Sequence, residues 1–408
     1  MTDVDLDAER LIALLARRPL VWDTRIDADW ERLLALALQH GVAPVVYSRL
    51  KERGLILPSR IADELRQIYL ASAARNMHLF HELGNILRAL QAAGVPVIPL
   101  KGACLAEAVY GNIALRPMDD VDLLVKPGHI AEALGILRLL GYLPDHPFDP
   151  IAEQAIGPHM PPISAPGGVT VELHWTIVYP GYHARFGNED LEGLWSRVTP
   201  ATIGGVSVLM FSPTDLLLHV CMHVSAQHRF DDMGLRAFLD MAQVCRRHGD
   251  AIDWKAFAAR SNEWGIANGV RLALQLSREW TDLDLPSYVL PALDADPPDD
   301  ALIGWARHKI LHGSPLALRM NVVRVVGEAR IAGKLRALWD AAFPSREEIA
   351  RMYLASAGSW RILGYYPVRF RDLWTRYRRA LWQVVRRDKT FIADAHKEAR
   401  LREYLGWR

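Results

Sequence analysis

The sequence from Pro96 to Val125 constrains the fold more than any other stretch, because it combines the signals of a strand, a tight turn, a helix and a second strand. The apolar run from Val97 to Leu100 predicts a buried strand, and Lys101-Gly102 breaks that run. Ala103 to Tyr110 has the composition of a helix, and a second apolar run begins near Met118 and predicts a second strand. This order predicts a compact unit in which a helix connects two strands.

Two acidic residues lie on the second predicted strand. Asp120 and Asp122 are two residues apart and so point to one face, while Val121 and Leu123 point into the core. Two carboxylates on one face of an apolar strand are costly to bury unless a cation lies between them, and Mg²⁺ prefers such oxygen ligands. The turn at Lys101-Gly102 would offer backbone N–H groups to a phosphate. A D-x-D alone would equally allow a solvated strand end. Together with the Lys101-Gly102 turn and the apolar run before it, the D-x-D favours a metal–nucleotide site.

The motifs in this stretch also resemble a known family. The residues KGACLA, the pair YG and the run RPMDDVDLLV follow one another between Lys101 and Val125. They resemble the nucleotidyltransferase superfamily that includes DNA polymerase β, and more closely its largely uncharacterised bacterial branch. The resemblance implies a small mixed β-sheet core and an NTP as substrate. It also implies two Mg²⁺ (or Mn²⁺) ions, held by the D-x-D and by a third carboxylate from a later strand.

The resemblance assigns roles to individual residues. Asp120 and Asp122 match the D-x-D, and Glu172 in VELHW is the natural third acid, so these three are the expected catalytic and metal-binding residues. Gly102 matches the glycine that lets the backbone approach the nucleotide phosphates. Ala103 stands where the superfamily has a serine, which removes a hydroxyl contact to phosphate.

Two cations near the motif are expected to offset charge on the β- and γ-phosphates. Lys101, a residue type that the bacterial branch carries beside the glycine, is one of them, and Arg116 is the other. Arg116 directly precedes Pro117, and its alternative role is to brace the turn into the strand. The sequence is consistent with both roles.

The strand predicted from Val169 to Ile177 supplies the third acid. We expect it to pair with residues 160–164 through a turn at Pro166-Gly167-Gly168. Its alternation places Glu172 and His174 on the face opposite the apolar residues. Glu172 therefore leaves the apolar face, as a metal ligand must, and His174 is expected to contact the nucleotide. A surface-exposed Glu-x-His is the alternative.

A helix predicted to begin at Ser212 carries histidines four residues apart. His219 and His223 share one helix face, the spacing of helical metal sites, but no glutamate occupies the H-E-x-x-H position, so a zinc hydrolase is not favoured. In the bacterial branch a similar helix is followed by an arginine and an aspartate, which Arg236 and Asp240 match. We interpret these four residues as structural or as lining the nucleotide pocket.

Composition excludes several other classes of protein. The 408 residues are 50% hydrophobic and 23% charged, as in ordinary globular proteins, and no apolar run reaches the length of a transmembrane helix. The three cysteines form no C-x-x-C pair, which excludes a disulfide framework and predicts the reducing cytoplasm. The acidic N-terminus lacks the order of a signal peptide.

Charge is distributed unevenly along the chain. Residues 301–408 contain 22 Lys/Arg and 9 Asp/Glu, against 26 and 38 in the remainder. This basic region, rich in tryptophan and tyrosine, would suit RNA, DNA or an anionic membrane surface, although a solvated helix face is the simpler explanation. Its clustered arginines are Arg376, Arg378, Arg379, Arg386 and Arg387.

These signals together predict an α+β fold. We expect a helical region over residues 1–95, the nucleotidyltransferase core over 96–211, a helical domain over 212–300 and the basic helical region over 301–408. In the first region, Ser59 is expected to cap a helix that runs to about Ala93.

The resulting hypothesis is a Mg-dependent enzyme that transfers a nucleoside monophosphate from an NTP to an unidentified hydroxyl acceptor, a small molecule or a peptide. An RNA- or protein-directed transferase of toxin type is one alternative. A non-catalytic nucleotide-binding module is another, which Ala103 permits. The sequence identifies neither the acceptor nor the base of the NTP, ATP being one candidate.

Overall fold

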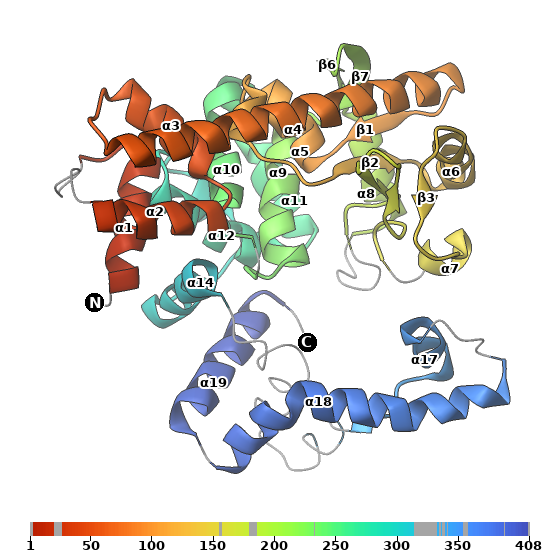
Figure 1. The fold of residues 1–408 in the computed structure, drawn as a ribbon. Coiled ribbons are helices and arrows are strands. Elements are labelled where there is room, and N and C mark those ends of the chain that lie inside the picture. Colours follow the sequence, from red (N-terminus) through yellow and green to blue (C-terminus); the bar gives the residue numbers. More distant parts are fainter. Residues whose placement is uncertain are drawn as a thin grey trace. The chain divides into compact units, whose positions relative to one another are not determined.

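The computed structural model describes residues 3–19, 27–154, 157–178, 186–231 and 233–313, and in the remainder 333, 336, 339–340, 342–353, 358–386 and 388–406. Contacts divide the chain into two compact units, residues 1–297 and 298–408, and each is described by itself. Figure 1 shows the elements coloured along the sequence. Within the described ranges, no helix combines the length and the hydropathy that a bilayer crossing requires.

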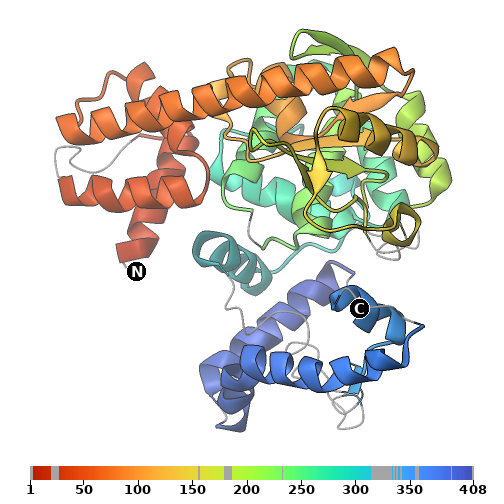
Figure 2. The same cartoon turned by 45° about the vertical axis from the view of Figure 1, so that its right-hand side comes forward.

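Four helices precede the first strand: α1 (Asp3–Leu15), α2 (Asp27–Gln39), α3 (Ala43–Glu52) and α4 (Ser59–Ala92). In Figures 1 and 2, α4 runs from the N-terminal helices to the sheet. Its apolar stripe is buried in the same hydrophobic core as the strands and includes Leu79, Leu83, Ile86, Leu87 and Leu90. At about 1.5–3 kcal/mol for each fully buried aliphatic side chain, this stripe anchors the helix to the sheet.

The extent predicted for α4 is confirmed, but its predicted cap is wrong. Ser59 is the first helical residue, and Pro58, with φ −53° and ψ 134°, occupies the cap position without a side-chain hydrogen bond. A proline is compatible with a helix start because the N–H that it lacks would have no helical partner there. The serine is therefore displaced by one residue from the position where its hydroxyl could cap.

Residues 1–297 contain a five-stranded mixed sheet. Its strands are β1 (Val97–Pro99), β2 (Val121–Val125), β3 (Leu143–Pro144), β4 (Ile163–Ser164) and β5 (Thr170–His174). Their order across the sheet is β1-β2-β5-β4-β3. β2 pairs antiparallel with β1 and parallel with β5, and β4 pairs antiparallel with both β5 and β3. The predicted α+β class and the predicted pairing of β4 with β5 are confirmed.

The strand that carries the D-x-D begins later than the sequence predicts, at Val121 instead of near Met118. The carbonyl groups of Pro117, Met118 and Asp119 accept hydrogen bonds from arginine side chains, at 2.9, 2.8 and 3.0 Å. Because these carbonyls are bonded to arginines, the segment does not join the strand ladder. Asp120 consequently precedes the strand and Asp122 lies on it.

Short helical elements connect the strands. After β1 come α5 (Lys101–Cys104), a π-helical turn η1 (Leu105–Val109) and a 3₁₀ turn η2 (Ile113–Leu115). After β2 come η3 (Pro127–His129), α6 (Ile130–Leu139) and α7 (Pro150–Gln154), and α8 (Asn188–Ser196) follows β5. A separate hairpin, β6 (Thr199–Ile203) with β7 (Val206–Met210), turns at Gly204-Gly205.

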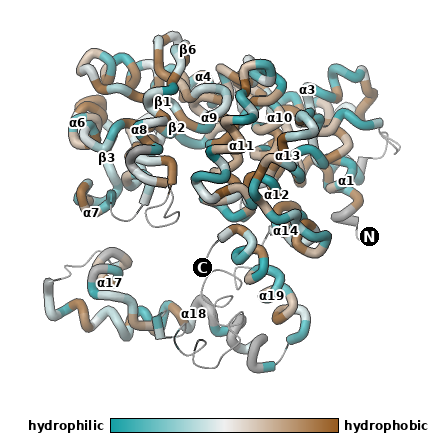
Figure 3. Tube along the Cα trace, turned by 180° about the vertical axis from the view of Figure 1, so that it is seen from behind, coloured by the Kyte–Doolittle hydropathy of each residue, from teal (hydrophilic) through white to brown (hydrophobic). Residues whose placement is uncertain are grey.

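A second group of helices completes residues 1–297. They are α9 (Pro213–Met222), the π-helical turn η4 (His223–Gln227), α10 (Arg236–His248), η5 (Gly249–Ala251), α11 (Trp254–Glu263), α12 (Ala267–Trp280) and α13 (Val289–Ala292). Ser212 caps α9 as predicted, since its hydroxyl accepts a hydrogen bond from the backbone of Asp215 at 3.2 Å. Hydrophobic and hydrophilic residues alternate along these helices in Figure 3, as expected for helices that pack on one face.

The second unit contains α14 (Asp300–His312), α17 (Arg346–Met352), η7 (Trp360–Gly364), α18 (Tyr365–Val385) and α19 (Lys389–Tyr404). A buried ion pair joins α14 to α19, with Lys309 Nζ 2.9 Å from Glu398 Oε2, and Trp305 Nε1 donates to the same oxygen at 3.0 Å. Of the clustered arginines, the side chains of Arg376 and Arg379 and the whole of Arg387 lie outside the described part of the chain.

Candidate active site

Two acidic residues meet on neighbouring strands of the sheet. The parallel register of β2 and β5 places Asp122 opposite Glu172. Side chains that are opposite each other in a parallel pair leave the sheet on the same face, so the two carboxylates are neighbours. Asp122 is only 2% exposed, whereas Glu172 is partly exposed. The sheet therefore holds one buried and one accessible carboxylate side by side.

Lys101 supplies a positive charge to this pair. Its Nζ atom lies 2.8 Å from Asp122 Oδ1 and 4.0 Å from Glu172 Oε2. The backbone of Lys101 adopts φ +46°, a left-handed conformation that disfavours residues with a Cβ atom by about 1–2 kcal/mol. Such strain is retained where the surroundings fix it, often at functional sites. Here it turns the chain from β1 into α5 and directs the ammonium group toward the two acids.

His174 completes a cluster of potential ligands. Its Nε2 atom lies 2.8 Å from Asp122 Oδ1 and 3.7 Å from Glu172 Oε2. One donor atom from each of these three residues lies within 4.8 Å of the other two. The alternation predicted for β5 is confirmed at Val171 and Leu173, which are buried, but His174 on the opposite face is also buried, at 2% exposure.

The charges in the cluster change the pKa values of its members. Burial alone would raise the pKa of Asp122, but Lys101 and His174 hold it well below its ordinary value. Glu172 shows the same balance: burial raises its pKa, but the hydrogen bond to His174 lowers it, and the net pKa is below the ordinary value. Burial lowers the pKa of His174, but its two carboxylate partners raise it above the ordinary value. The cluster thus favours its charged forms.

Asp120 has the opposite character. Burial, together with the negative charges of Asp122 and Glu172, raises its pKa from 3.8 to about 6. Its carboxylate is not one of the three groups that converge within 4.8 Å. Asp120 therefore lies beside the cluster as a carboxylate on which burial and two negative neighbours outweigh the charge of Lys101, and an added positive charge would stabilise it strongly.

The glycine turn is closely packed against an arginine. A Cβ atom on Gly102 would lie 2.7 Å from Arg116 Nη1 and 2.9 Å from Met118 Cγ. Arg116 Nε and Nη2 donate to both oxygens of Asp240, at 3.0 Å each for the closest contacts. The hydroxyl of Tyr110 donates to the same aspartate at 2.8 Å. Arg116 is thus braced by Asp240, while none of the described hydrogen bonds uses its Nη1 atom beside the glycine.

Side chains from distant helices hold the segment that leads to Asp120. From α4, Ser72 donates to the carbonyl of Ala114 at 2.8 Å, Asn76 donates to those of Ile113 and Arg116, and Arg75 donates to those of Met118 and Asp119. From α10, Arg236 donates to the carbonyl of Pro117. An irregular segment has no ladder partners for its carbonyls, so these bonds replace them. We refer to the four side chains Ser72, Arg75, Asn76 and Arg236 as the loop clamp.

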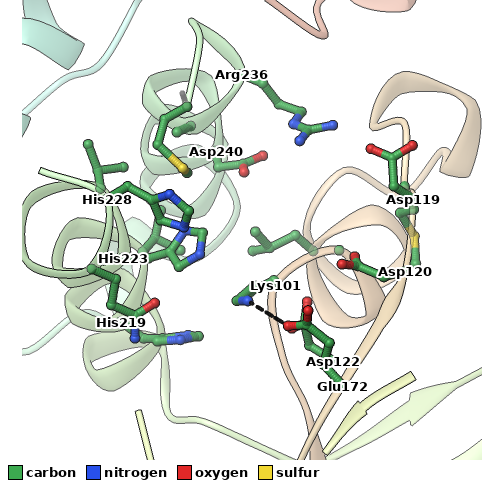
Figure 4. Close-up of a pocket in the computed structure, with 18 of the residues that line it drawn as sticks. Lys101, Asp119, Asp120, Asp122, Glu172, His219, His223, His228, Arg236 and Asp240 are labelled. Carbon is green, nitrogen blue, oxygen red and sulfur yellow. Dashed lines mark hydrogen bonds and ion pairs between the residues drawn. The ribbon is translucent and has the colours of Figure 1, made fainter. Parts of the chain in front are cut away.

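These groups face a cavity of about 330 Å³. In Figure 4, the carboxylates of Asp119, Asp120, Asp122 and Glu172 lie on one side, His219, His223, His228, Arg236 and Asp240 lie on the other, and Lys101 projects between them. Both π-helical turns contribute to the cavity, η1 through Leu105 and η4 through His223, Val224 and Gln227. Such turns are rare and occur often at functional sites.

His219 and His223 on the far wall favour their neutral forms. Burial and the positive charge of Lys101 lower the pKa of His219 to about 3, and they hold that of His223 well below its ordinary value. The two rings are 6.3 Å apart, and His223 stacks edge-on against His228 at 4.6 Å. This wall can accept or donate a hydrogen bond without adding charge to the cavity.

The structure brings most of the predicted site residues to this cavity. The lining includes Lys101, Gly102, Arg116, Asp120, Asp122, Glu172, His174, His219, His223, Arg236 and Asp240. Ala103 lies elsewhere: it is fully buried in the hydrophobic core. Sequence reasoning did not find the loop clamp. The spacing of Ser72, Arg75 and Asn76 on one face of a predicted helix was the available signal, but nothing in it shows what that face contacts.

The fold and the site define a class. A mixed sheet, two acids on neighbouring strands, a lysine–glycine turn between strand and helix, and a polar cavity over them are the parts of a nucleotidyltransferase. Residues 27–282 match the family described as uncharacterised nucleotidyltransferase, and the chain belongs to that family. It is therefore a transferase, the family implies an NTP as substrate, and nucleotidyltransferases typically use divalent metal ions.

Other comparisons add little. A comparison with curated proteins finds no match. Among solved structures, the solution structure of the antibiotic-resistance factor ANT(2'')-Ia is similar, with 14% sequence identity and a TM-score of 0.31, over 50% of this chain and 92% of that chain. A similarity at this level carries no inference about substrate.

Proposed function

We propose that the chain transfers a nucleoside monophosphate from an NTP to a hydroxyl acceptor. The acceptor hydroxyl would give its proton to the Glu172 carboxylate as its oxygen forms a bond to the α-phosphorus. The bond from that phosphorus to the bridging oxygen of the β-phosphate would break, and pyrophosphate would leave. The observation that carries the proposal is the pairing of Asp122 with Glu172 beside Lys101 and the Gly102 turn, at the wall of one cavity.

The donor set fits a divalent cation, Mg²⁺ or Mn²⁺. Asp122, Glu172 and His174 each place one donor atom within 4.8 Å of the others, and Asp122 and Glu172 already attract an ammonium group. We propose that Asp120 joins them when a cation is present, because burial and the charges of Asp122 and Glu172 raise its pKa more than Lys101 lowers it. A cation held there would polarise the phosphate oxygens and lower the pKa of the acceptor hydroxyl.

The residues around the turn would hold the triphosphate. Gly102 would let the backbone lie close to the phosphates. A side chain at this position would also collide with Arg116 and Met118. Lys101 would offset phosphate charge through its ammonium group. Arg116 would do so through Nη1 while Asp240 fixes the other two nitrogens, so bracing and phosphate binding are compatible roles.

The acceptor would enter from a neighbouring cavity. An adjoining space of about 420 Å³ is lined by parts of α4 and shares Pro117, Asp119, Met233 and Arg236 with the first cavity. An NTP would fill most of the 330 Å³ beside the acids. We therefore propose that the second space receives a small molecule or the end of a peptide.

The direct test uses NTPs labelled at the α-phosphorus, with Mg²⁺ or Mn²⁺ and separate pools of small molecules, peptides and RNA. We expect the label to move to one of the first two pools with release of pyrophosphate, and Asp122→Asn to reduce turnover by at least a hundredfold. Label on RNA would instead favour an RNA-directed enzyme, for which the basic region 301–408 is the supporting observation. NTP binding without pyrophosphate release in any pool, or full turnover by Asp122→Asn, would contradict the proposal.

A further inference from the structure

We propose that His174 is a ligand of the divalent cation, so that the site is a mixed nitrogen–oxygen site that prefers Mn²⁺ and other first-row transition metals over Mg²⁺. The inference deepens the proposed function, because it concerns the cation of the same site. It goes beyond the sequence-based expectation, in which all the metal ligands are carboxylates and His174 contacts the nucleotide.

The first support is the spacing of the donor atoms. A metal with bonds of about 2.1 Å places adjacent ligand atoms about 3 Å apart. His174 Nε2 lies 2.8 Å from Asp122 Oδ1 and 3.7 Å from Glu172 Oε2. Nε2 thus lies at ligand spacing from Asp122 and slightly farther from Glu172; the hydrogen on Nε2 now bonds to Asp122, and a metal ion bound among the three groups would replace it. Asp120, by contrast, lies outside this group of three.

The second support is that the backbone fixes the histidine in this position. Residues 158–160 bond to the end of β5, with Trp175 N donating to Pro158 O at 3.0 Å and Met160 N donating to Leu173 O at 2.8 Å. The His174 side chain is 3% exposed, and its Nδ1 atom is buried with no hydrogen-bond partner among the residues that the structure describes. Because the ring cannot turn toward solvent, Nε2 stays directed at the two carboxylates.

The third support is that a cation already shares these acids. Lys101 Nζ lies 2.8 Å from Asp122 Oδ1, the same oxygen that His174 approaches. The ammonium group thus occupies one cation position at the acids, and a metal ion must either displace it or bind on the other side, toward Glu172 and His174. The nitrogen ligand is therefore close to the position that remains for the metal.

The preference among metals follows from the nitrogen. Imidazole is a good ligand for first-row transition metals, whereas Mg²⁺ selects oxygen atoms and retains water in place of nitrogen. The dissociation constant for Mn²⁺ should therefore be at least tenfold lower than that for Mg²⁺. Because carboxylate oxygens also suit Mn²⁺, the discriminating result is that His174→Gln narrows the difference in affinity between the two ions, whereas an all-carboxylate site would keep that difference unchanged.

Pulsed electron paramagnetic resonance of Mn²⁺ bound to the full-length protein, without nucleotide, tests this inference directly. We expect hyperfine coupling to one imidazole nitrogen in the wild type and its loss in His174→Gln, which keeps a hydrogen-bonding side chain of similar size. His159→Gln and His219→Gln are matched controls and should retain the coupling. The ring of His159 lies 5.0 Å from that of His174, so it is the nearest competing source of nitrogen.

A second variant keeps the test decisive if His174→Gln does not fold. Lys101→Met removes the resident positive charge, so Mn²⁺ affinity should rise several-fold while the nitrogen coupling persists. Absence of nitrogen coupling in wild-type protein that binds Mn²⁺, coupling that depends on His159 in place of His174, or equal affinity for Mn²⁺ and Mg²⁺ would each overturn the inference. None of these results would affect label transfer from an NTP, so the inference can fail while the proposed function stands.

Discussion

Replacing Asp120 by asparagine should stabilise the protein while removing its activity. In the absence of a metal, Asp120 is an ionised carboxylate beside two others, and its pKa rises from 3.8 to about 6. A shift of this size corresponds to a ceiling of about 3 kcal/mol at pH 7, because each pKa unit is worth about 1.36 kcal/mol. Asp120 is partly exposed, and solvent screening reduces the expected gain to about 1–2 kcal/mol.

The pH dependence of this effect has a defined sign. Asp120 binds its proton more tightly in the folded than in the unfolded protein, so the folded form is favoured by protonation. Below about pH 4 both states are protonated, and wild type and Asp120→Asn should have equal stability. The difference should grow as pH rises from 4 to 6 and stay constant above about 6. Stability would be measured by urea unfolding at fixed pH, with EDTA present to remove metal ions.

Asp119→Asn is the matched control, because Asp119 is the exposed neighbour and its side chain should change stability by less than about 0.5 kcal/mol. Added Mn²⁺ should reverse the order, since the ion would compensate the charge of Asp120 in the wild type only. A destabilised Asp120→Asn protein without metal, or a gain that is as large at pH 4 as at pH 7, would refute the reasoning about clustered negative charge.

Three further predictions concern the surroundings of the acids. Gly102→Ala should raise the KM for the NTP at least tenfold and lower the free energy of unfolding by about 1–3 kcal/mol, because the new Cβ would lie 2.7 Å from Arg116 Nη1. Steady-state kinetics measure the first effect and denaturant unfolding the second. An unchanged KM would contradict the prediction. Asn76→Ala removes two hydrogen bonds to the loop and should lower the free energy of unfolding by about 2 kcal/mol. It should also lower kcat more than it raises KM. A loss of stability with unchanged kinetics would show that the loop clamp does not position Asp120. Ala71→Trp fills the second cavity and should lower kcat/KM for the acceptor at least tenfold without affecting NTP binding. Ala74→Trp, on the same helix but outside that cavity, is the control. Equal effects of the two variants would exclude this acceptor site.

The local part of the site could be predicted from the sequence because it depends on patterns of near neighbours. The alternation of apolar and polar residues in VELHW predicts that Glu172 lies on the face opposite the apolar residues. The turn at Lys101-Gly102 predicts where the strand ends and the helix begins. The resemblance to nucleotidyltransferases then pairs Glu172 with Asp122, and the register of β2 with β5 places them together. Only the alternation and the turn need short-range information alone; the pairing of the two acids comes from the resemblance.

The remainder depends on contacts between distant parts of the chain. Arg75 and Arg236 bond to the carbonyls before Asp120 from 43 and 119 residues away, and these bonds move the start of β2 to Val121. The burial of His174 likewise results from residues 158–160, which cover the end of β5. No periodicity in the sequence encodes such long-range hydrogen bonds.

Calorimetric titration of a non-hydrolysable NTP, with Mn²⁺ or with EDTA, tests the central claim most directly. We propose that Asp122 and Glu172 bind the cation and that the cation binds the triphosphate. The wild type should therefore bind the NTP at least a hundredfold more tightly with Mn²⁺ than with EDTA. Asp122→Asn should lose that dependence. Equal binding with and without the ion, or metal-dependent binding that survives in Asp122→Asn, would show that this pair of carboxylates is not the nucleotide site.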